Sequence, residues 1–423
     1  MTTSKSRGPL TNLLVWSLTA SLLLPYPAVL AGPSGGQVVD GQGSITQQGG
    51  NTTQILQQSQ RLAIEWQNFD IAANETVVFQ QPGASAVALN RILSQDPSQI
   101  FGALNANGQV FLINPSGIVF GPNARVDVAS LVASTLDLSV DDFMRGNYNL
   151  QAVADRAGGL VVNRGTLTAA TGGSIALVGS EVRNEGVIVA DYGRVSLAAG
   201  EQATVDFDGD GMLLFALTPE GDGSTSTSQD AMIALNTGTI SAEGGEVLMS
   251  AQAARDVVSS VVNNEGIIEA GRIDSQGGVI RLVGSGVTTN SGVLDASGRT
   301  ASDTGGSVRV LGDEVRLESG ARVSATGAAG GGEVLVGGGF QGGEGVQTAQ
   351  TTRVARGATI DVSANAGGDA GRAIVWSDDT TVFRGSIAAR GGADGGDGGL
   401  VEVSGLVNLT YRGEVDASAP GGG

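Results

Sequence analysis

The chain has 423 residues with 42 acidic against 23 basic side chains, so its formal net charge is −19. It contains no cysteine and no histidine, which excludes disulfides, Cys/His zinc sites and Ser-His or Cys-His nucleophile pairs. An acidic chain without basic patches is also a poor binder of nucleic acid.

The N-terminal segment, residues 1–31, has the features of a secretory signal peptide. Lys5 and Arg7 form a basic start, and Leu10–Leu24 is an apolar run that is short for a membrane span. Ala31 is a small residue at the position that precedes a cleavage site. We therefore predict cleavage after Ala31 and export across the inner membrane.

A turn motif joins two apolar runs in the next part of the chain. The runs are Val110–Ile113 and Ile118–Phe120, and the motif between them is Asn114-Pro115-Ser116-Gly117-Ile118. Proline presets φ at the second position of a turn, glycine suits the fourth, and asparagine opens it. The motif predicts a turn that the fold requires, with direct contact to a partner protein as the alternative role.

From about residue 160 the chain becomes repetitive, with two alternating elements. The first is Asn-x-Gly followed by apolar alternation, with copies at Asn163, Asn184, Asn264 and Asn290. The second is a glycine pair followed by a short apolar run, with copies at Gly172, Gly305, Gly331 and Gly398. Alternation with a period of two predicts strands with one buried face, and glycine and asparagine supply the turns.

Repeats of this length predict an all-β solenoid. Units of 20 to 28 residues cannot close a core alone, so they must stack on copies of themselves. Short strands with no helical segment between them indicate a parallel β-helix, with about ten coils over residues 160–423. A β-sandwich or propeller is the alternative, but a propeller blade needs a longer unit. Asparagines at the same turn of successive coils are expected to stack their amides into a ladder with a structural role.

Two segments interrupt the repeats. Asp206, Asp208 and Asp210 match the start of a calcium loop, but Leu217 stands where a bidentate glutamate is required. A plain acidic turn is therefore favoured over calcium, and no cofactor is expected. Gly338–Thr352 is expected to form a Gly- and Gln-rich loop between coils.

An enzyme is the rival to a binding protein, because parallel β-helices also carry polysaccharide-degrading sites. Asp378 and Asp379 are the obvious carboxylate pair. Adjacent residues of a strand point to opposite faces, so we do not expect this pair to be catalytic. At the C-terminal end, the last repeat opens at Gly413 and stops before its second strand, which predicts that the chain continues past Gly423.

The segment from Leu62 to Ser139 carries a family resemblance. Its anchors, in order, are Ile64–Ile71, Ser85–Arg91, Phe101–Leu104, Asn107–Ile118 and Leu131–Thr135. This pattern is similar to the secretion domain of two-partner-secretion exoproteins, a family that includes filamentous haemagglutinin and the high-molecular-weight adhesins. The motif at Asn114 matches the family's Asn-Pro-Asn-Gly-Ile with Ser116 in place of the second asparagine. A second family motif, Asn-Pro-Asn-Leu, has no counterpart here, which favours the adhesin-like branch.

The resemblance implies a fold, a route and a partner. It implies a right-handed parallel β-helix with an N-terminal cap, in which residues 32–150 are the secretion domain and residues 151–423 are further coils. It implies passage through the periplasm of a double-membraned bacterium and export by an outer-membrane β-barrel transporter with periplasmic domains. The expected product is a secreted or surface-displayed adhesin that binds a receptor or glycan on a host or neighbouring cell. A polysaccharide-degrading enzyme and the N-terminal part of a cytolysin or contact-dependent toxin remain the alternatives.

Overall fold

The computed structural model describes residues 32–422, apart from 154–158, 206–231 and 253–259. The predicted cleavage site at Ala31 and the calcium candidates Asp206, Asp208 and Asp210 lie outside the described residues. Within the described ranges, no helix is long and apolar enough to cross a membrane.

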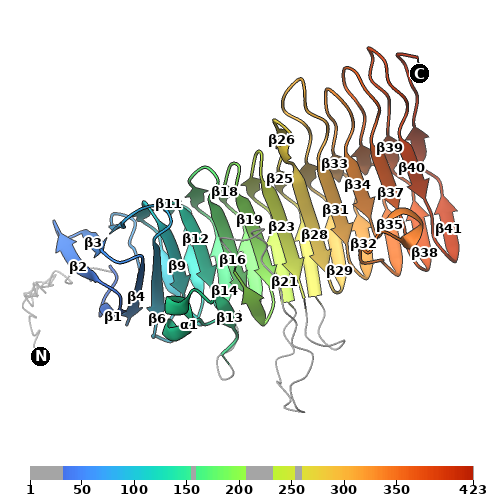
Figure 1. The fold of residues 1–423 in the computed structure, drawn as a ribbon. Coiled ribbons are helices and arrows are strands. Elements are labelled where there is room, and N and C mark those ends of the chain that lie inside the picture. The colour runs from blue at the N-terminus through green and yellow to red at the C-terminus, as the bar shows by residue number, and fades with distance from the viewer. Residues whose placement is uncertain (1–31, 154–158, 206–231, 253–259, 423) are drawn as a thin grey trace, which may run out of the picture. The chain divides into compact units, whose positions relative to one another are not determined.

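Three long sheets run along the chain, and successive strands visit them in a fixed order (Figure 1). Sheet 1 contains β1 (Gln37–Asp40), β4 (Arg61–Trp66), β6 (Val87–Ile92), β9 (Gln109–Ile113), β12 (Ser130–Ser134), β16 (Ser174–Gly179), β19 (Arg194–Ala199), β23 (Glu246–Ala251), β28 (Val279–Gly284), β31 (Ser307–Leu311), β34 (Glu333–Val336), β37 (Arg372–Val375) and β40 (Leu400–Val403). Sheet 2 contains β7 (Ser98–Ile100), β10 (Ile118–Phe120), β14 (Leu160–Asn163), β17 (Glu181–Asn184), β21 (Met232–Asn236), β24 (Ser260–Asn264), β29 (Val287–Asn290), β32 (Glu314–Leu317), β35 (Thr351–Val354), β38 (Thr380–Phe383) and β41 (Asn408–Tyr411). Sheet 3 contains β2 (Gly43–Gln48), β3 (Thr52–Gln57), β5 (Thr76–Gln80), β8 (Ala103–Ala106), β11 (Arg125–Val128), β15 (Thr166–Ala169), β18 (Val187–Val189), β22 (Thr239–Ser241), β25 (Ile267–Glu269), β30 (Val293–Asp295), β33 (Arg322–Ser324), β36 (Thr359–Asp361), β39 (Ser386–Ala388) and β42 (Glu414–Asp416).

The predicted right-handed parallel β-helix with an N-terminal cap is confirmed. Neighbouring strands of the three sheets pair in parallel, so each strand of one coil lies beside its counterpart in the next. The exceptions in the three sheets are at the N-terminal end, where β1 pairs antiparallel with β4 and β2 pairs antiparallel with β3. These reversed strands lie over the first coils and form the cap.

The number of coils differs from the sequence prediction. From residue 160 onward, the described residues form eight coils with a strand in every sheet, followed by β41 and β42. The prediction of about ten coils assumed that all of residues 160–423 belong to repeats of one length. The residues of the long connections, such as those between β34 and β35, add no strand to any sheet.

The core is a column of apolar side chains between the three sheets. Alternate strand residues point inward, as Ile175 and Leu177 of β16 do, and both are buried. The inward positions hold mostly Val, Ile, Leu and Ala, because a narrow interior accommodates branched aliphatic side chains better than rings. Burying each such side chain is worth about 1.5–3 kcal/mol, and the repeated columns extend this stabilisation from coil to coil.

An asparagine ladder occupies one of these inward columns, at the end of the sheet 2 strands. Its members are Asn163, Asn184, Asn236, Asn264 and Asn290, all fully buried. Each Nδ2 donates to the Oδ1 of the next member, at 2.8 Å in every step. The predicted ladder is therefore confirmed and has one more member than predicted. Asn236 escaped notice because 52 residues separate it from Asn184, although Asn236-Thr237-Gly238 carries the same Asn-x-Gly pattern.

A second layer covers the outer face of sheet 1 over the early coils. It consists of α1 (Val140–Arg145) and an antiparallel pair made by β13 (Asn149–Gln151) and β20 (Gln202–Thr204), which we call the clasp. Ser139 caps α1 by accepting a hydrogen bond from the backbone N–H of Asp142, and Gly146 ends the helix in the left-handed conformation. The clasp encloses a separate apolar cluster that includes Leu89, Phe111, Val132, Phe143, Tyr148, Leu150, Ala176 and Ala198.

A third apolar cluster lies farther along the same face. The predicted loop at Gly338–Thr352 is confirmed as a connection between β34 and β35, although Thr351 and Thr352 already belong to β35. It contains a single 3₁₀ turn at Phe340–Gly342 and packs over Leu335, Ile374 and Trp376. The ion pair between Arg372 and Glu344, at 2.5 Å, ties the loop to β37.

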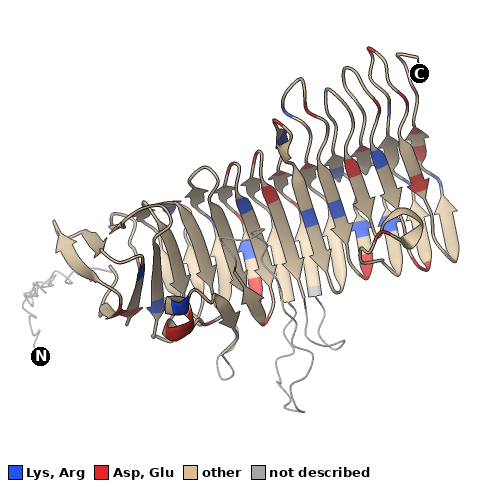
Figure 2. Ribbon diagram, viewed as in Figure 1, with Lys and Arg blue, Asp and Glu red and all other residues tan. Residues whose placement is uncertain are grey.

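Charged residues lie on the outward positions of the strands and at the turns (Figure 2). On sheet 1 they pair between neighbouring coils, as Arg194 does with Glu246 at 3.5 Å and Arg309 with Glu333 at 3.4 Å. Pairs this exposed contribute little to stability, so they serve mainly to keep the outer face polar. Elsewhere a short antiparallel hairpin, β26 (Arg272–Ile273) with β27 (Gln276–Gly277), projects from a corner.

Candidate functional site: the turn at Asn114

The predicted turn at Asn114–Ile118 forms the corner between β9 of sheet 1 and β10 of sheet 2. The backbone N–H of Gly117 donates to the carbonyl oxygen of Asn114 at 3.0 Å, which closes a four-residue turn. Pro115 occupies the second position, where its fixed φ favours this geometry. The apolar runs on either side are the two strands, as the sequence predicted.

The side chain of Asn114 is fully buried and all of its polar atoms are used. Its Nδ2 donates to the carbonyl oxygen of Asp96 and to Oγ of Ser98, each at 3.0 Å. Its Oδ1 accepts a hydrogen bond from the backbone N–H of Ser116 at 2.9 Å. Asn114 therefore joins its own turn to the corner of the preceding coil.

Gly117 is confined on both sides. Its φ is +127°, a region that favours glycine. A Cβ atom at this position would lie 3.3 Å from the carbonyl oxygen of Leu160 in the following coil and 3.3 Å from Cβ of Pro97 in the preceding one. The Gly117 carbonyl oxygen also accepts from the backbone N–H of Ser98 at 3.0 Å. The backbone conformation thus favours glycine, and the stacked coils leave little room for a side chain.

Ser116, the residue that departs from the family motif, bonds to the preceding coil through its side chain. Its Oγ donates to the carbonyl oxygen of Ser94 at 3.3 Å, and it is the one partly exposed residue among the five of the motif. The serine hydroxyl therefore connects the turn to the corner of the preceding coil.

The strand that leads into the turn is buried on both faces. Val110 and Leu112 of β9 point into the main core, whereas Phe111 and Ile113 point outward and are covered by the clasp. The ring of Phe111 packs edge-on against Phe143 of α1, with ring centres 5.8 Å apart. The turn is therefore held by the coils next to it and, through β9, by the clasp.

Arg91 links the clasp to the coils beneath it, a role that the sequence analysis did not assign. On the outer face of sheet 1 it donates to both carboxylate oxygens of Asp137, at 2.8 and 2.7 Å, and to Glu65 at 3.0 Å. Hydrogen bonding to Asp137 raises the pKa of Arg91 further above its usual value, so the side chain stays charged. No local pattern could have paired Arg91 with an acid 46 residues away.

The candidate carboxylate pair takes a different place from the expected one. Asp378 and Asp379 lie in the bend between β37 and β38, so the expectation that they stand on opposite faces of a strand was wrong. Asp378 accepts hydrogen bonds from Nε1 of Trp376 at 3.0 Å and from Oγ1 of Thr348 at 2.6 Å. Its carboxylate therefore anchors the loop between β34 and β35. Over the described residues, no group of three or more Asp or Glu side chains is placed to hold a metal ion.

Comparison with known proteins extends the resemblance. The family model described as "TPS secretion domain" matches residues 31–296. A heme/hemopexin-binding protein of Haemophilus influenzae strain Rd is 33% identical over 248 residues, which are 57% of this chain and 23% of that protein. A second heme/hemopexin-binding protein of Haemophilus influenzae is 45% identical over 84 residues, which are 20% of this chain and 9% of that protein. This chain therefore spans less than a quarter of the length of either relative.

A solved structure covers nearly the whole chain. The crystal structure of the HMW1 secretion domain from Haemophilus influenzae superposes with a TM-score of 0.80 at 32% sequence identity, over 91% of this chain and 98% of that one. The parallel β-helix, the resemblance at Leu62–Ser139 and these matches lead to one assignment: the chain belongs to the TPS secretion domain family.

Proposed function

We propose that this chain is exported by a dedicated outer-membrane β-barrel transporter and serves as the secretion domain and first coils of a surface adhesin. Residues 1–31 direct it to the periplasm, residues 32–150 carry the cap and first coils, and residues 151–423 continue the β-helix. Its destination is the cell surface or the medium outside a double-membraned bacterium. Membership of the TPS secretion domain family supports this route.

We further propose that the Asn114–Ile118 turn acts in export through folding. Asn114 and Gly117 are buried in the folded domain, so they offer little surface for a partner to read. They join three consecutive coils instead, from Asp96 to Leu160. A chain that folds coil by coil as it leaves the transporter needs this corner before the next coil can stack on it.

The adhesin role is favoured over an enzymatic one because the candidate catalytic acid, Asp378, has a structural role. Asp378 is engaged by Trp376 and Thr348, which is a structural task. Regular outward rows of side chains, repeated from coil to coil, suit extended contact with another surface. The receptor or glycan on the other cell is the partner that this role requires.

A haem-related role is the second candidate, because both relatives carry that name. The identical stretch covers 23% of the better-covered relative, so it need not include the part that binds heme or hemopexin. This chain has no histidine or cysteine, which leaves methionine and tyrosine as axial ligands for haem iron. We therefore assign the shared stretch to export.

Co-expression tests the proposal. The full chain is produced in a laboratory bacterium with or without an outer-membrane transporter of the two-partner-secretion class, and the medium and cell surface are probed for it. We expect the chain outside the cell only when the transporter is present, and adhesion of those cells to epithelial or bacterial layers. Export that does not depend on the transporter would contradict the route, and export without adhesion would contradict the adhesin role.

A further inference from the structure

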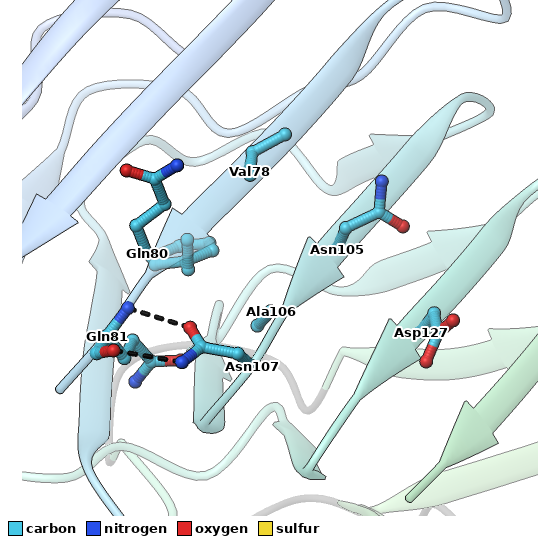
Figure 3. Close-up of a pocket in the computed structure, with 8 residues that line it drawn as sticks. Val78, Gln80, Gln81, Asn105, Ala106, Asn107 and Asp127 are labelled. Carbon is cyan, nitrogen blue, oxygen red and sulfur yellow. Dashed lines mark hydrogen bonds between the residues drawn. The ribbon is translucent and has the colours of Figure 1, made fainter. Parts of the chain in front are cut away.

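A shallow hollow of about 420 Å³ lies on the outer face of sheet 3, across β5, β8 and β11 (Figure 3). Neighbouring residues of a strand point to opposite faces. Val78, Gln80, Asn105 and Asp127 therefore stand outward, while the residues between them are buried in the core. These side chains project from paired strands, so the backbone that carries them is held in place by the sheet.

One end of the hollow is closed by the side chain of Asn107. Its Oδ1 accepts from the backbone N–H of Gln81 at 2.8 Å, and its Nδ2 donates to the Gln81 carbonyl oxygen at 2.9 Å. Figure 3 shows both bonds as dashed lines. The backbone pairing of β5 with β8 ends just before, at Phe79 and Ala106, so the side-chain amide continues the ladder by one step. Both polar atoms of the Asn107 side chain are therefore already engaged.

Three polar side chains of the hollow are free. Within the described ranges, Gln80, Asn105 and Asp127 have no hydrogen-bond or ion-pair partner, and Figure 3 draws none between them. Asn105 pairs in register with Val78 of one neighbouring strand and Asp127 of the other. The row thus repeats at the strand spacing of about 4.8 Å and presents a methyl surface, an amide and a carboxylate in turn.

These groups match the chemistry of a sugar. Amides donate and accept, and a carboxylate accepts, so together they suit hydroxyl groups, which do both. Val78 offers an apolar contact for the C–H face of a sugar ring. An anion is disfavoured by Asp127 and by the net charge of −19, and a calcium ion needs more oxygen ligands than one carboxylate. A peptide strand binds by pairing at a sheet edge, whereas this face presents side chains only.

We propose that the hollow binds an extended, uncharged glycan whose chain runs across the strands, so that successive sugars meet successive coils. The strand spacing is close to the length of one hexose unit in such a chain. The inference rests on the proposed adhesin function and names the surface that carries recognition.

Titration of the purified, exported chain tests the hollow directly. The probes are three neutral hexasaccharides (cellohexaose, maltohexaose and chitohexaose) and an array of uncharged glycans. We expect saturable binding of at least one probe, and a loss of affinity of at least about tenfold in the double variant Asn105→Ala, Asp127→Ala, because two hydrogen bonds disappear. Thr168→Ala is the matched control: Thr168 pairs in register with Asp127 on the next strand but lies outside the hollow.

Two results would overturn the hollow as a glycan site. One is that no uncharged glycan binds saturably. The other is that the double variant binds as well as the unchanged chain, with both showing the same circular dichroism and thermal unfolding. A cell-adhesion assay distinguishes failure of the glycan site from failure of the adhesin role. If cells carrying the double variant adhere like those carrying the unchanged chain, the adhesin role stands but its recognition lies outside the hollow. If cells carrying the unchanged chain do not adhere, the adhesin role fails.

Discussion

Arg91 and Asp137 form a two-pronged ion pair across 46 residues of sequence, with Nε 2.8 Å from Oδ1 and Nη2 2.7 Å from Oδ2. Arg91 belongs to β6 of sheet 1, and Asp137 lies in the segment that leads into α1. The guanidinium also contacts Glu65 on β4, so it joins two coils to the clasp. The ion pair and the apolar cluster under α1 therefore both hold the clasp against the coils.

Replacing Arg91 by alanine is expected to loosen the clasp. A partly buried, bidentate pair is worth more than an exposed one, so we expect the free energy of unfolding to fall by about 1–2 kcal/mol. Urea denaturation of the purified chain measures this. Arg145→Ala is the control, because the Arg145–Asp141 pair is 3.5 Å long and its side chains are 64% and 82% exposed. Equal effects of the two substitutions would contradict the role given to Arg91.

Removing Asn184 from the middle of the ladder is expected to be costly. Asn184→Ala leaves the Nδ2 of Asn163 and the Oδ1 of Asn236 without their ladder partners inside the core. Two such losses lower the free energy of unfolding by about 2–4 kcal/mol.

Asn290→Ala, at the end of the ladder, is the control for Asn184→Ala in its middle. It removes the last member and breaks a single step, the one from Asn264. We expect about half of the Asn184 effect by urea denaturation. A larger loss for the terminal substitution than for the central one would show that the ladder does not act as a chain of equivalent bonds.

The substitution Gly117→Val is expected to block secretion. At φ +127° a β-branched residue is strained by about 1–3 kcal/mol, and the Cβ atom also meets Leu160 and Pro97. Secreted yield is measured in the presence of the transporter, and refolding from urea is followed separately. Gly83→Val is the control, since a Cβ there meets nothing within 4 Å and the backbone is not left-handed. Normal secretion of Gly117→Val would mean that the motif is dispensable.

Protein recovered outside the cell is expected to begin at Gly32. The basic start, the apolar run and the small residue Ala31 predict cleavage after Ala31. N-terminal sequencing of the exported chain decides this. A chain that still begins at Met1 would contradict the assignment of residues 1–31 as a signal peptide.

Asp303 is expected to make part of the stability depend on pH. Burial alone would raise the pKa of this fully buried carboxyl, but hydrogen bonds from Thr300, Ser275 and Asp274 hold the pKa below its usual value. The folded value therefore lies below the unfolded value of about 3.9. The contribution of Asp303 is complete above that value and disappears as the pH falls through the lower, folded pKa.

Comparison with Asp303→Asn isolates this contribution. We expect the urea midpoint of the variant to be lower than that of the unchanged chain at neutral pH, and the difference to shrink below about pH 4. The exposed Asp394, replaced by asparagine, is the control and should show no such trend. A difference that stays constant from neutral to acid pH would exclude the role of the Asp303 carboxylate.

The strands, their corners and most of the asparagine ladder followed from local patterns. Alternation with a period of two indicates which side chain of a strand is buried, and glycine or asparagine indicates where the chain turns. Val110–Ile113, Ile118–Phe120 and the turn between them could be read in this way, as could four of the five ladder asparagines. Asn236 was not predicted, because the 52 residues between it and Asn184 are about twice the usual repeat length.

The clasp, the position of Asp378 and the hollow at Asn105 were decided only by the tertiary structure. Phe111 stands on the outward side of its strand, and its burial depends on α1 arriving from another part of the chain. Asp378 finds its partner in a loop 30 residues earlier. A sequence pattern reports the faces of one element, whereas what covers an outward face depends on which distant segment packs there.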